Sequence, residues 1–460
     1  MPGPVSSSSL PPPTEQPFRV APSFHKVEDT GSFVPGDFEA QYEKLFSDAL
    51  SSGPITPLER ERLDFAASAL GLDKKRLERL ENALLAAYEA HAAISSVDDT
   101  APYDALVETS PRPQRQASIP ELAGDELSVP PPPPAPATAA AADPNLDLHA
   151  RFHAADLDER FRLAAVLVRR GAARPEEMAL YDVHRPRSPL RPAQPLDAKA
   201  WTSLLRHPDE DAIVGDIFAV IASAALLGRI TALRRDKLLE RLDPAMKQDP
   251  ATSTVSATRA IAWAAATLGM NAPPIFLAPE RDDGMVIVPA LPPALRVGAR
   301  MLRGQSAIQL AFHAARSLSW LRGEHFVCTL VAHLSHLEDL FLAALRIGAP
   351  ELPMPPDVRK RIDVIKAAIL PVLEMEHIAT LRYHVSSFVE RGGRTSLRGW
   401  ARGTELTACR AGLTLSGDLV GCAALVAGEP GGPDRIRDLE EFWIGDACAS
   451  LRAHLGVSLG

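Results

Sequence analysis

Residues 96–144 divide the chain into two parts that can fold. The stretch contains five consecutive prolines at 130–134, followed by the alanine-rich APATAAAAD, and its apolar residues do not recur at helical or strand spacing. Consecutive prolines favour an extended spacer, and an alanine run is flexible or weakly helical. A proline-rich ligand for an aromatic groove is the alternative interpretation. The sequence predicts a disordered linker here, a disordered segment at 1–36, and two ordered regions that fold independently.

Residues 37–95 carry three segments with apolar residues at helical spacing. Tyr42, Phe46 and Leu50 share one helix face. A second helix is expected to start at Thr56, because a capping side chain there is followed by proline and by a glutamate at the third helical position. The module resembles the small helical modules of the tellurite-resistance-B-like type. We interpret it as a three-helix interaction module without chemistry.

Residues 145–249 are predicted to form a helical region. Three short amphipathic segments, LDLHARFHAA, LDERFRLAAVLVRRG and PEEMALYDVH, resemble a tetratricopeptide-like hairpin. One hairpin cannot bury its own apolar face, so it must dock on the domain that follows. The packing helices after it include the apolar run IFAVIASAALL at 217–227. That run is too short to span a bilayer and indicates a buried helix.

The hydrophobic periodicity changes after Gly269. Two short β-type runs, 275–277 and 285–288, flank ERDDG, whose Asp-Gly pair favours a turn, and 294–302 can form a third strand. A long helix then starts near Ser306, which can cap it. We therefore predict a mainly α chain, in which 250–460 is a mostly helical α+β domain with a small antiparallel sheet.

The composition disfavours several classes of partner. The chain has 58 acidic and 49 basic residues, a net charge of −9, which disfavours nucleic acid and anionic lipid as main partners. The first residues, MPGPVSSSSLPPPTEQ, lack the cationic and apolar regions of a secretory signal. Four cysteines without close C-x-x-C spacing indicate buried, reduced thiols. We predict a cytoplasmic protein that binds neither nucleic acid nor a membrane.

Two segments of the last domain are similar to parts of a zinc-peptidase site. RVGARMLRGQSAIQLAFHAARSLSWLR resembles the strand, turn and active-site helix of gluzincin metallopeptidases, the family of the bacterial heat-shock membrane protease and the CAAX prenyl endopeptidase. GTELTACRAG resembles that family's third-ligand helix, in which Glu405 matches a zinc-binding glutamate and Cys409 replaces an aspartate. The order spans 250–428 and also resembles uncharacterised helical-repeat proteins of predatory soil bacteria. The resemblance implies a gluzincin-like domain over 250–460.

The helix that should carry the H-E-x-x-H motif has lost it. The matching positions have Arg316 and Trp320 where histidines would ligate zinc, and Ser317 where a glutamate would act as general base. Neither arginine nor tryptophan can ligate a metal. The resemblance therefore implies a pseudoenzyme without a cofactor, whose vestigial site comprises Arg316, Ser317, Trp320, Glu405 and Cys409. Because a lone buried carboxylate is costly, we expect Arg316 to pair with Glu405 within ~4 Å.

A second group of residues offers possible metal ligands, namely His325, Cys328, His333 and His336. On one continuous helix these side chains would not all converge, because His333 lies about 100° round the axis from the shared face. Nothing outside the segment supplies matching partners for metal-bound histidines. We interpret these residues as packing or surface side chains, with a metal site as the alternative.

Together these patterns predict a non-catalytic protein that binds another protein or an extended peptide. A peptidase cleft and edge strand can hold an extended chain by β-addition even without a metal. Two alternatives remain open. One is an active metal-dependent hydrolase whose site the sequence does not reveal, and the other is a purely structural assembly module.

Overall fold

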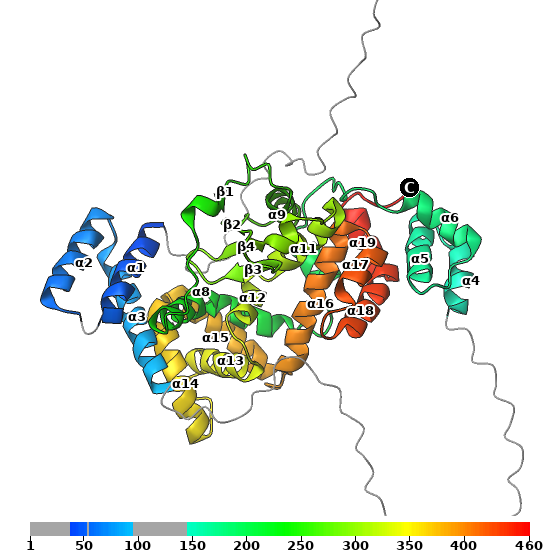
Figure 1. The fold of residues 1–460 in the computed structure, drawn as a ribbon. Coiled ribbons are helices and arrows are strands. Elements are labelled where there is room, and N and C mark those ends of the chain that lie inside the picture. Colours follow the sequence, from blue (N-terminus) through cyan, green and yellow to red (C-terminus); the bar gives the residue numbers. More distant parts are fainter. Residues whose placement is uncertain (1–36, 53–54, 95–144) are drawn as a thin grey trace, which may run out of the picture.

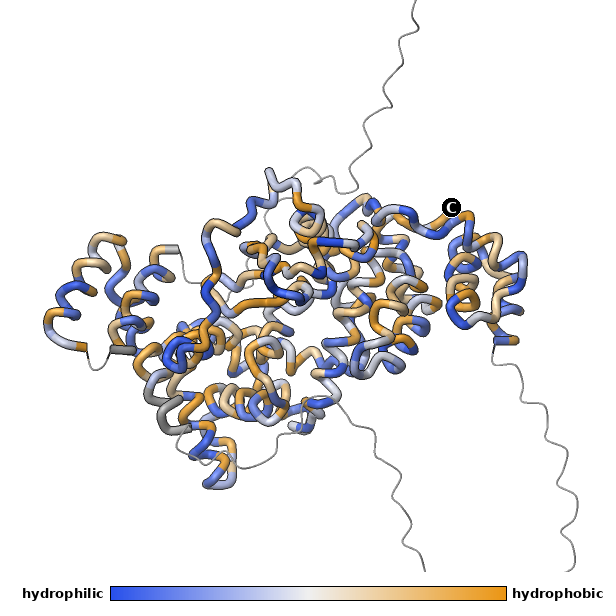
Figure 2. Tube along the Cα trace, viewed as in Figure 1, coloured by the Kyte–Doolittle hydropathy of each residue, from blue (hydrophilic) through white to orange (hydrophobic). Residues whose placement is uncertain are grey.

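The computed structural model describes residues 37–52, 55–94 and 145–460, so the expected disordered segment and linker lie outside the described ranges. Within these ranges the chain forms nineteen α-helices, several single-turn helices and four short strands (Figure 1). Hydrophilic and hydrophobic residues alternate along most helices, as expected of helices with one buried face (Figure 2). The predicted mainly helical fold with a small sheet is confirmed. Its apolar side chains form two buried cores.

The first core joins both ends of the region 145–460. Its helices are α4 (Leu146–Ala154), α5 (Leu157–Arg169), α6 (Pro175–His184), α7 (Ala198–Ala200) with η1 (Trp201–Leu205), α9 (Ser256–Thr267), α11 (Ala307–Ser319), α17 (Leu419–Val426), α18 (Gly432–Ile444) and α19 (Asp446–His454). The hairpin of α4 to α6 docks on α17 and α18, where Arg162 Nη1 donates to the Trp443 carbonyl oxygen at 2.9 Å. The helices α4 to α7 and η1 thus share this core with α9 and α11.

The second core is built around α8 (Ala212–Arg235). Its other helices are α1 (Asp37–Ser52), α2 (Pro57–Ala69), α3 (Lys74–Ile94), α13 (Leu334–Gly348), α14 (Pro356–Ile369), η4 (Leu370–Val372) and α15 (Met375–Glu390). α3 packs on α8 and α14, so the N-terminal module lies against the C-terminal region (Figure 1). The sequence predicted a module that folds independently. The packing on α8 and α14 could not be predicted, because amphipathic periodicity identifies the buried face of a helix but not what covers that face.

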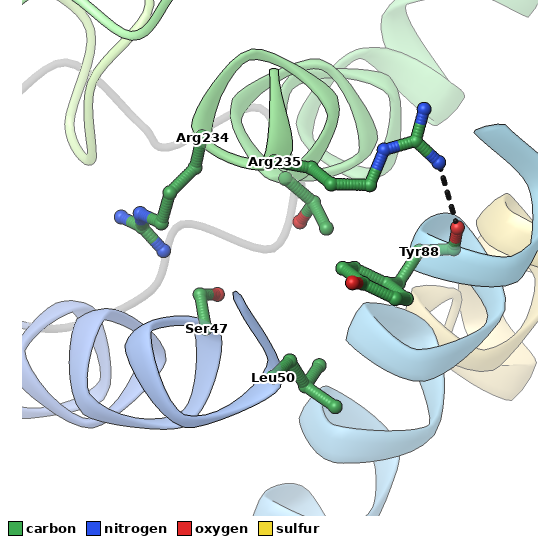
Figure 3. Close-up of a pocket in the computed structure, with 6 residues that line it drawn as sticks. Ser47, Leu50, Tyr88, Arg234 and Arg235 are labelled. Carbon is green, nitrogen blue, oxygen red and sulfur yellow. Dashed lines mark hydrogen bonds between the residues drawn. The ribbon is translucent and has the colours of Figure 1, made fainter. Parts of the chain in front are cut away.

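Charged groups hold the N-terminal module on α8. Arg234 donates two hydrogen bonds to the Glu43 carboxylate. Arg235 Nη1 donates to the Tyr88 carbonyl oxygen at 3.2 Å (Figure 3). The space that Ser47, Tyr88, Arg234 and Arg235 help to line has a volume of ≈ 10 Å³, room for about one water molecule. This junction is a packed interface and not a ligand pocket.

Within the described ranges, α8 is the one helix that is long and apolar enough to cross a membrane. Of its most apolar window, 61% is buried inside the protein. Ile217, Phe218 and Ile221 are fully enclosed, and the Phe218 ring packs against Phe341 and Trp400 at centroid distances of 5.5 and 5.0 Å. In this fold the helix forms the centre of the second core.

The sheet has four strands in the order β1-β2-β4-β3, namely β1 (Lys247–Gln248), β2 (Ile275–Ala278), β3 (Met285–Val288) and β4 (Ala294–Gly298). β1 and β3 run antiparallel to their neighbours, whereas β2 and β4 run parallel. The sheet is thus mixed, not wholly antiparallel as predicted. The Asp-Gly segment does not join β2 to β3 as a hairpin, because Asp283 Oδ2 accepts from Arg296 Nη2 at 2.8 Å and holds the loop against β4.

Five further elements complete the fold. They are η2 (Pro244–Met246), α10 (Ala299–Leu302), α12 (Gly323–Phe326), η3 (Val327–Thr329) and the long α16 (Leu397–Ser416). α16 joins the two cores, since Leu397 and Trp400 near its start belong to the second core and Cys409 and Leu413 to the first. Any side chain on the middle of α16 therefore lies near the boundary between the cores.

Candidate functional site

The proposed vestigial site lies where α11 packs along α16. α11 begins with the expected cap, because Ser306 Oγ accepts from Gln309 N at 3.2 Å and Gln309 Oε1 accepts from Ser306 N at 2.8 Å. The helices approach closely at Gly412, where an added Cβ would lie 2.6 Å from the Phe312 ring. From this contact the two helices run in opposite directions, which places Arg316 opposite Glu405.

Four charged side chains fill this site, and we call them the Arg316 network: Arg316, Glu405, Glu429 and Arg435. Arg316 donates two hydrogen bonds of 2.7 Å to Glu429, and its Nη2 lies 4.0 Å from Glu405 Oε1. Arg435 pairs with both glutamates. The distance between Arg316 and Glu405 therefore lies at the upper limit of the expected range. The main partner is Glu429, which the sequence did not single out because it lies in the turn after α17.

The Arg316 network keeps Glu429 ionised, while burial keeps the neighbouring thiol neutral. Burial alone would raise the pKa of Glu429, but the hydrogen bonds and charge of Arg316, with the charge of Arg435, hold that pKa below its ordinary value. Burial raises the pKa of the Cys409 thiol to about 11, against the opposing charges of Arg316 and Arg435. Burial and then the charge of Arg316 lower the pKa of His313 to about 4. At neutral pH the site has paired charges, a neutral thiol and a neutral imidazole.

Ser317 and Trp320 take no part in this network. Ser317 is half-buried on α11, and its carbonyl oxygen accepts from the backbone N–H of Trp320 at 3.3 Å. Trp320 forms the C-terminal cap of α11, and its ring lies edge-on to His325 at a centroid distance of 6.4 Å. In the part of the chain that the structure describes, no group of three or more His, Cys, Asp or Glu side chains is arranged to hold a metal.

A second polar network, the Glu210 network, joins Glu210, His325 and Thr407. His325 Nε2 lies 2.8 Å from Glu210 Oε1, and His325 Nδ1 lies 3.1 Å from the Ser319 carbonyl oxygen. Thr407 Oγ1 donates to Glu210 Oε2 at 2.7 Å and accepts from His207 N at 2.9 Å. The side chains of His325 and Glu210 are 0% and 2% exposed. The network is therefore enclosed in the protein interior.

The remaining candidate metal ligands lie on other short elements than His325. Cys328 follows in η3, where burial raises its pKa to about 12 against a hydrogen bond with Thr404. His333 stands at the start of α13, one turn before His336, and their rings lie 5.5 Å apart, edge to face. The segment is thus broken into α12, η3 and α13, and this break directs the side chains to different partners.

A small pocket of ≈ 170 Å³ lies between the starts of α11 and α17. Ser306, Gln309, Phe312, Asp418 and Cys422 help to line it. Its polar groups already have structural roles, because Ser306 and Gln309 cap α11 and Asp418 Oδ1 accepts from Gly421 N at 3.0 Å to cap α17. The lining therefore does not converge on a ligand.

β3 has an open edge, because it pairs with β4 alone among the described strands. Gly298 N donates to the Gly284 carbonyl oxygen at 2.9 Å just before β3. In an antiparallel ladder hydrogen-bonded pairs alternate with non-bonded pairs, so Val286 is the next residue that bonds to β4. The N–H and C=O groups of Met285 and Ile287 accordingly point away from β4, toward the open edge.

Comparison of the chain with protein-family models, with curated proteins and with solved structures gives no match. The resemblance to gluzincin peptidases therefore depends on the order of the sheet, α11 and α16, and on the approach of Arg316 to Glu405. The side chains present at this place pair charges and pack.

Proposed function

We propose that this chain is a non-catalytic cytoplasmic protein that binds an extended peptide on a degenerate metallopeptidase-like domain. One observation supports the proposal: Arg316, which the resemblance assigns to a zinc-ligand position, pairs with Glu429 and lies 4.0 Å from Glu405. Arginine always carries its proton in proteins and cannot ligate zinc. The two glutamates that could ligate a metal are held by the two arginines instead.

The mode of binding follows from the open edge of β3. A peptide that adds beside β3 would exchange hydrogen bonds with the N–H and C=O groups of Met285 and Ile287. β3 also contacts α11, so such a peptide would lie near the helix that carries Arg316. Met285, Val286 and Ile287 are only half-buried, which leaves room for side chains of a partner.

Metal content and peptidase activity test the non-catalytic part. The full chain should retain far less than stoichiometric zinc after dialysis and should not cleave unfolded casein. The matched comparison is the double variant His333→Ala/His336→Ala. Near-stoichiometric zinc and cleavage in the native chain, both lost in this variant, would contradict the proposal and favour the metal-hydrolase alternative.

Peptide binding tests the open edge. A fluorescein-labelled peptide of alternating threonine and valine should raise its fluorescence anisotropy on the native chain. Met285→Pro removes one N–H from the open edge but no bond to β4, and should weaken binding by about tenfold or more, whereas Met285→Ala should not. Equal binding by the native chain and Met285→Pro would contradict β-addition. No binding even at millimolar peptide would favour the purely structural alternative.

A further inference from the structure

The segment from Met375 to Arg402 has a charge balance unlike that of the whole chain. It contains five arginines and two glutamates, with no lysine and no aspartate, while the chain as a whole carries a net charge of −9. The segment comprises α15, the turn after it and the first turns of α16. A local excess of arginine in an acidic protein indicates a surface that meets negative charge.

The fold presents these arginines outward. The inner face of α15 buries Leu381, Val385 and Phe388 in the second core, against α13 and α8 (Figure 1). At the other end Leu397 and Trp400 are buried at the start of α16. The residues between these buried anchors therefore form the outer surface of the turn.

The turn itself has a defined shape. Gly392 and Gly393 have φ values of 100° and 62°, and their N–H groups donate to the carbonyl oxygens of Val389 and Phe388 at 2.9 and 3.0 Å. Such bonds close the C-terminus of α15 in a left-handed turn, which favours glycine. Arg391 and Arg394 are thus held on either side of a fixed glycine pair.

Arg382, Arg391, Arg394 and Arg398 are all exposed. Among the described residues no hydrogen bond or ion pair is found for these four guanidinium groups, whereas Arg402 lies 3.6 Å from Asp434. An arginine guanidinium presents a planar fork of donors that matches a carboxylate. The four groups can therefore bind carboxylates of a partner without breaking existing pairs.

Exposed apolar side chains lie on the same helix. Met375, Tyr383 and Val389 on α15 are 75%, 69% and 47% exposed. Tyrosine and arginine are the residue types that most often dominate the binding energy of protein interfaces. Together with Arg382, Arg391, Arg394 and Arg398 these side chains make up what we call the α15 surface.

We propose that the α15 surface binds an acidic peptide segment of a partner protein that also carries apolar side chains. The exposed Met375 and Val389 are not aromatic, so they offer no stacking surface for bases and suit the apolar side chains of a peptide. The net charge of −9 also repels long polyanions. This proposal does not depend on peptide binding at β3, because it involves different elements of the fold.

The test measures binding of a defined probe to the full chain by fluorescence anisotropy. The probe is a fluorescein-labelled peptide of glutamate, leucine and phenylalanine, and its counterpart has glutamine in place of every glutamate. The variant Arg391→Gln/Arg394→Gln/Arg398→Gln should weaken binding of the glutamate probe by about tenfold or more. The matched control Arg187→Gln/Arg241→Gln/Arg303→Gln removes the same charge from exposed arginines elsewhere and should bind as the native chain does.

Both triple variants change exposed side chains and should keep the thermal midpoint of the native chain. Binding of the glutamate probe that is lost only in the α15 variant supports the proposal. Equal weakening in both variants, equal binding of the glutamine counterpart, or no binding by the native chain would overturn it. Tighter binding of a single-stranded oligonucleotide or of phosphatidylserine vesicles through the same three arginines would overturn it in favour of that partner class.

Discussion

The two polar networks beside α16 differ in how far water reaches them. The Glu210 network is enclosed, and its histidine and glutamate have almost no exposed surface. In the Arg316 network Arg316 is 18% and Glu405 36% exposed. The enclosed network uses one carboxylate shared by a histidine and a threonine, whereas the half-open one uses four full charges.

The difference follows from the energetics of burying charge. In a dry interior a carboxylate that loses its partner is left without solvent, so few charges are tolerated and each must be satisfied. Near the surface water screens the charges, and several arginines and glutamates can gather at lower cost. We therefore infer that the Glu210 network contributes more to the stability of the fold than the Arg316 network does.

The largest expected effect is that of Glu210→Ala. It would remove the partner of His325 Nε2 and of Thr407 Oγ1 in the interior, and should lower the free energy of unfolding by roughly 3–5 kcal/mol, measured with urea. The neighbouring Asp209→Ala, at a half-exposed side chain, should cost under about 0.5 kcal/mol. A loss of unfolding free energy below about 1 kcal/mol for Glu210→Ala would contradict the larger contribution of the Glu210 network to stability.

A smaller loss, about 1–2 kcal/mol, is expected for Arg316→Ala, between the values for exposed and buried pairs. Arg435 still pairs with Glu429 and Glu405 in this variant, so neither carboxylate is left alone. The double variant Arg316→Ala/Glu429→Gln should recover part of the loss in urea unfolding. If Arg316→Ala lowers the free energy of unfolding as much as Glu210→Ala does, water is excluded from the Arg316 network as fully as from the Glu210 network.

Acid should weaken the Arg316 network through Glu429. The pKa of Glu429 is lower in the folded chain than its ordinary value of 4.5, so its ionised form stabilises the fold above that value. This stabilisation is lost as the pH falls through the folded pKa. Between about pH 5 and pH 3 the free energy of unfolding should therefore fall less in Glu429→Gln than in the native chain. The difference between the two falls should be about 1 kcal/mol or less. Parallel curves of unfolding free energy against pH would show that Glu429 is not held ionised.

The smallest effect is expected at Ser317, which the proposed resemblance to peptidases assigns to the general-base position. No hydrogen bond of its hydroxyl is found among the described residues, so Ser317→Ala should change the free energy of unfolding by under about 0.5 kcal/mol. Thermal unfolding of the two chains checks this. A loss of more than about 1 kcal/mol would mean that the hydroxyl has a role in the site.

Helix starts could be predicted because their signals are local. Thr56 and Glu59 form the expected capping box, and Ser306 caps α11. The positions of β2, β3 and the first part of β4 were also recognisable from short apolar runs, whereas β1 was not predicted and residues 299–302 form α10 instead of strand. The order of the strands was not recognisable, because the position of β4 between β2 and β3 depends on contacts such as that of Asp283 with Arg296, which no local pattern encodes.

The candidate site, too, could be predicted only in part from the sequence. The approach of Arg316 to Glu405 was expected from a resemblance in the order of two helices. Glu429, Arg435 and Glu210 were not expected, because they lie in a turn, on a later helix and in a short loop, without a motif. Their partners become apparent only when the chain is folded.

The amino-acid order alone specifies where helices begin, which of their faces are apolar, and that Arg316, Ser317 and Trp320 cannot form a zinc site. These properties depend on residue type and on neighbours within a turn or two. Only the tertiary structure decides that Glu429 is the main partner of Arg316, that β2 and β4 run parallel, and that α3 packs on α8. Such contacts join residues far apart in the chain, and their energies depend on which surfaces exclude water together.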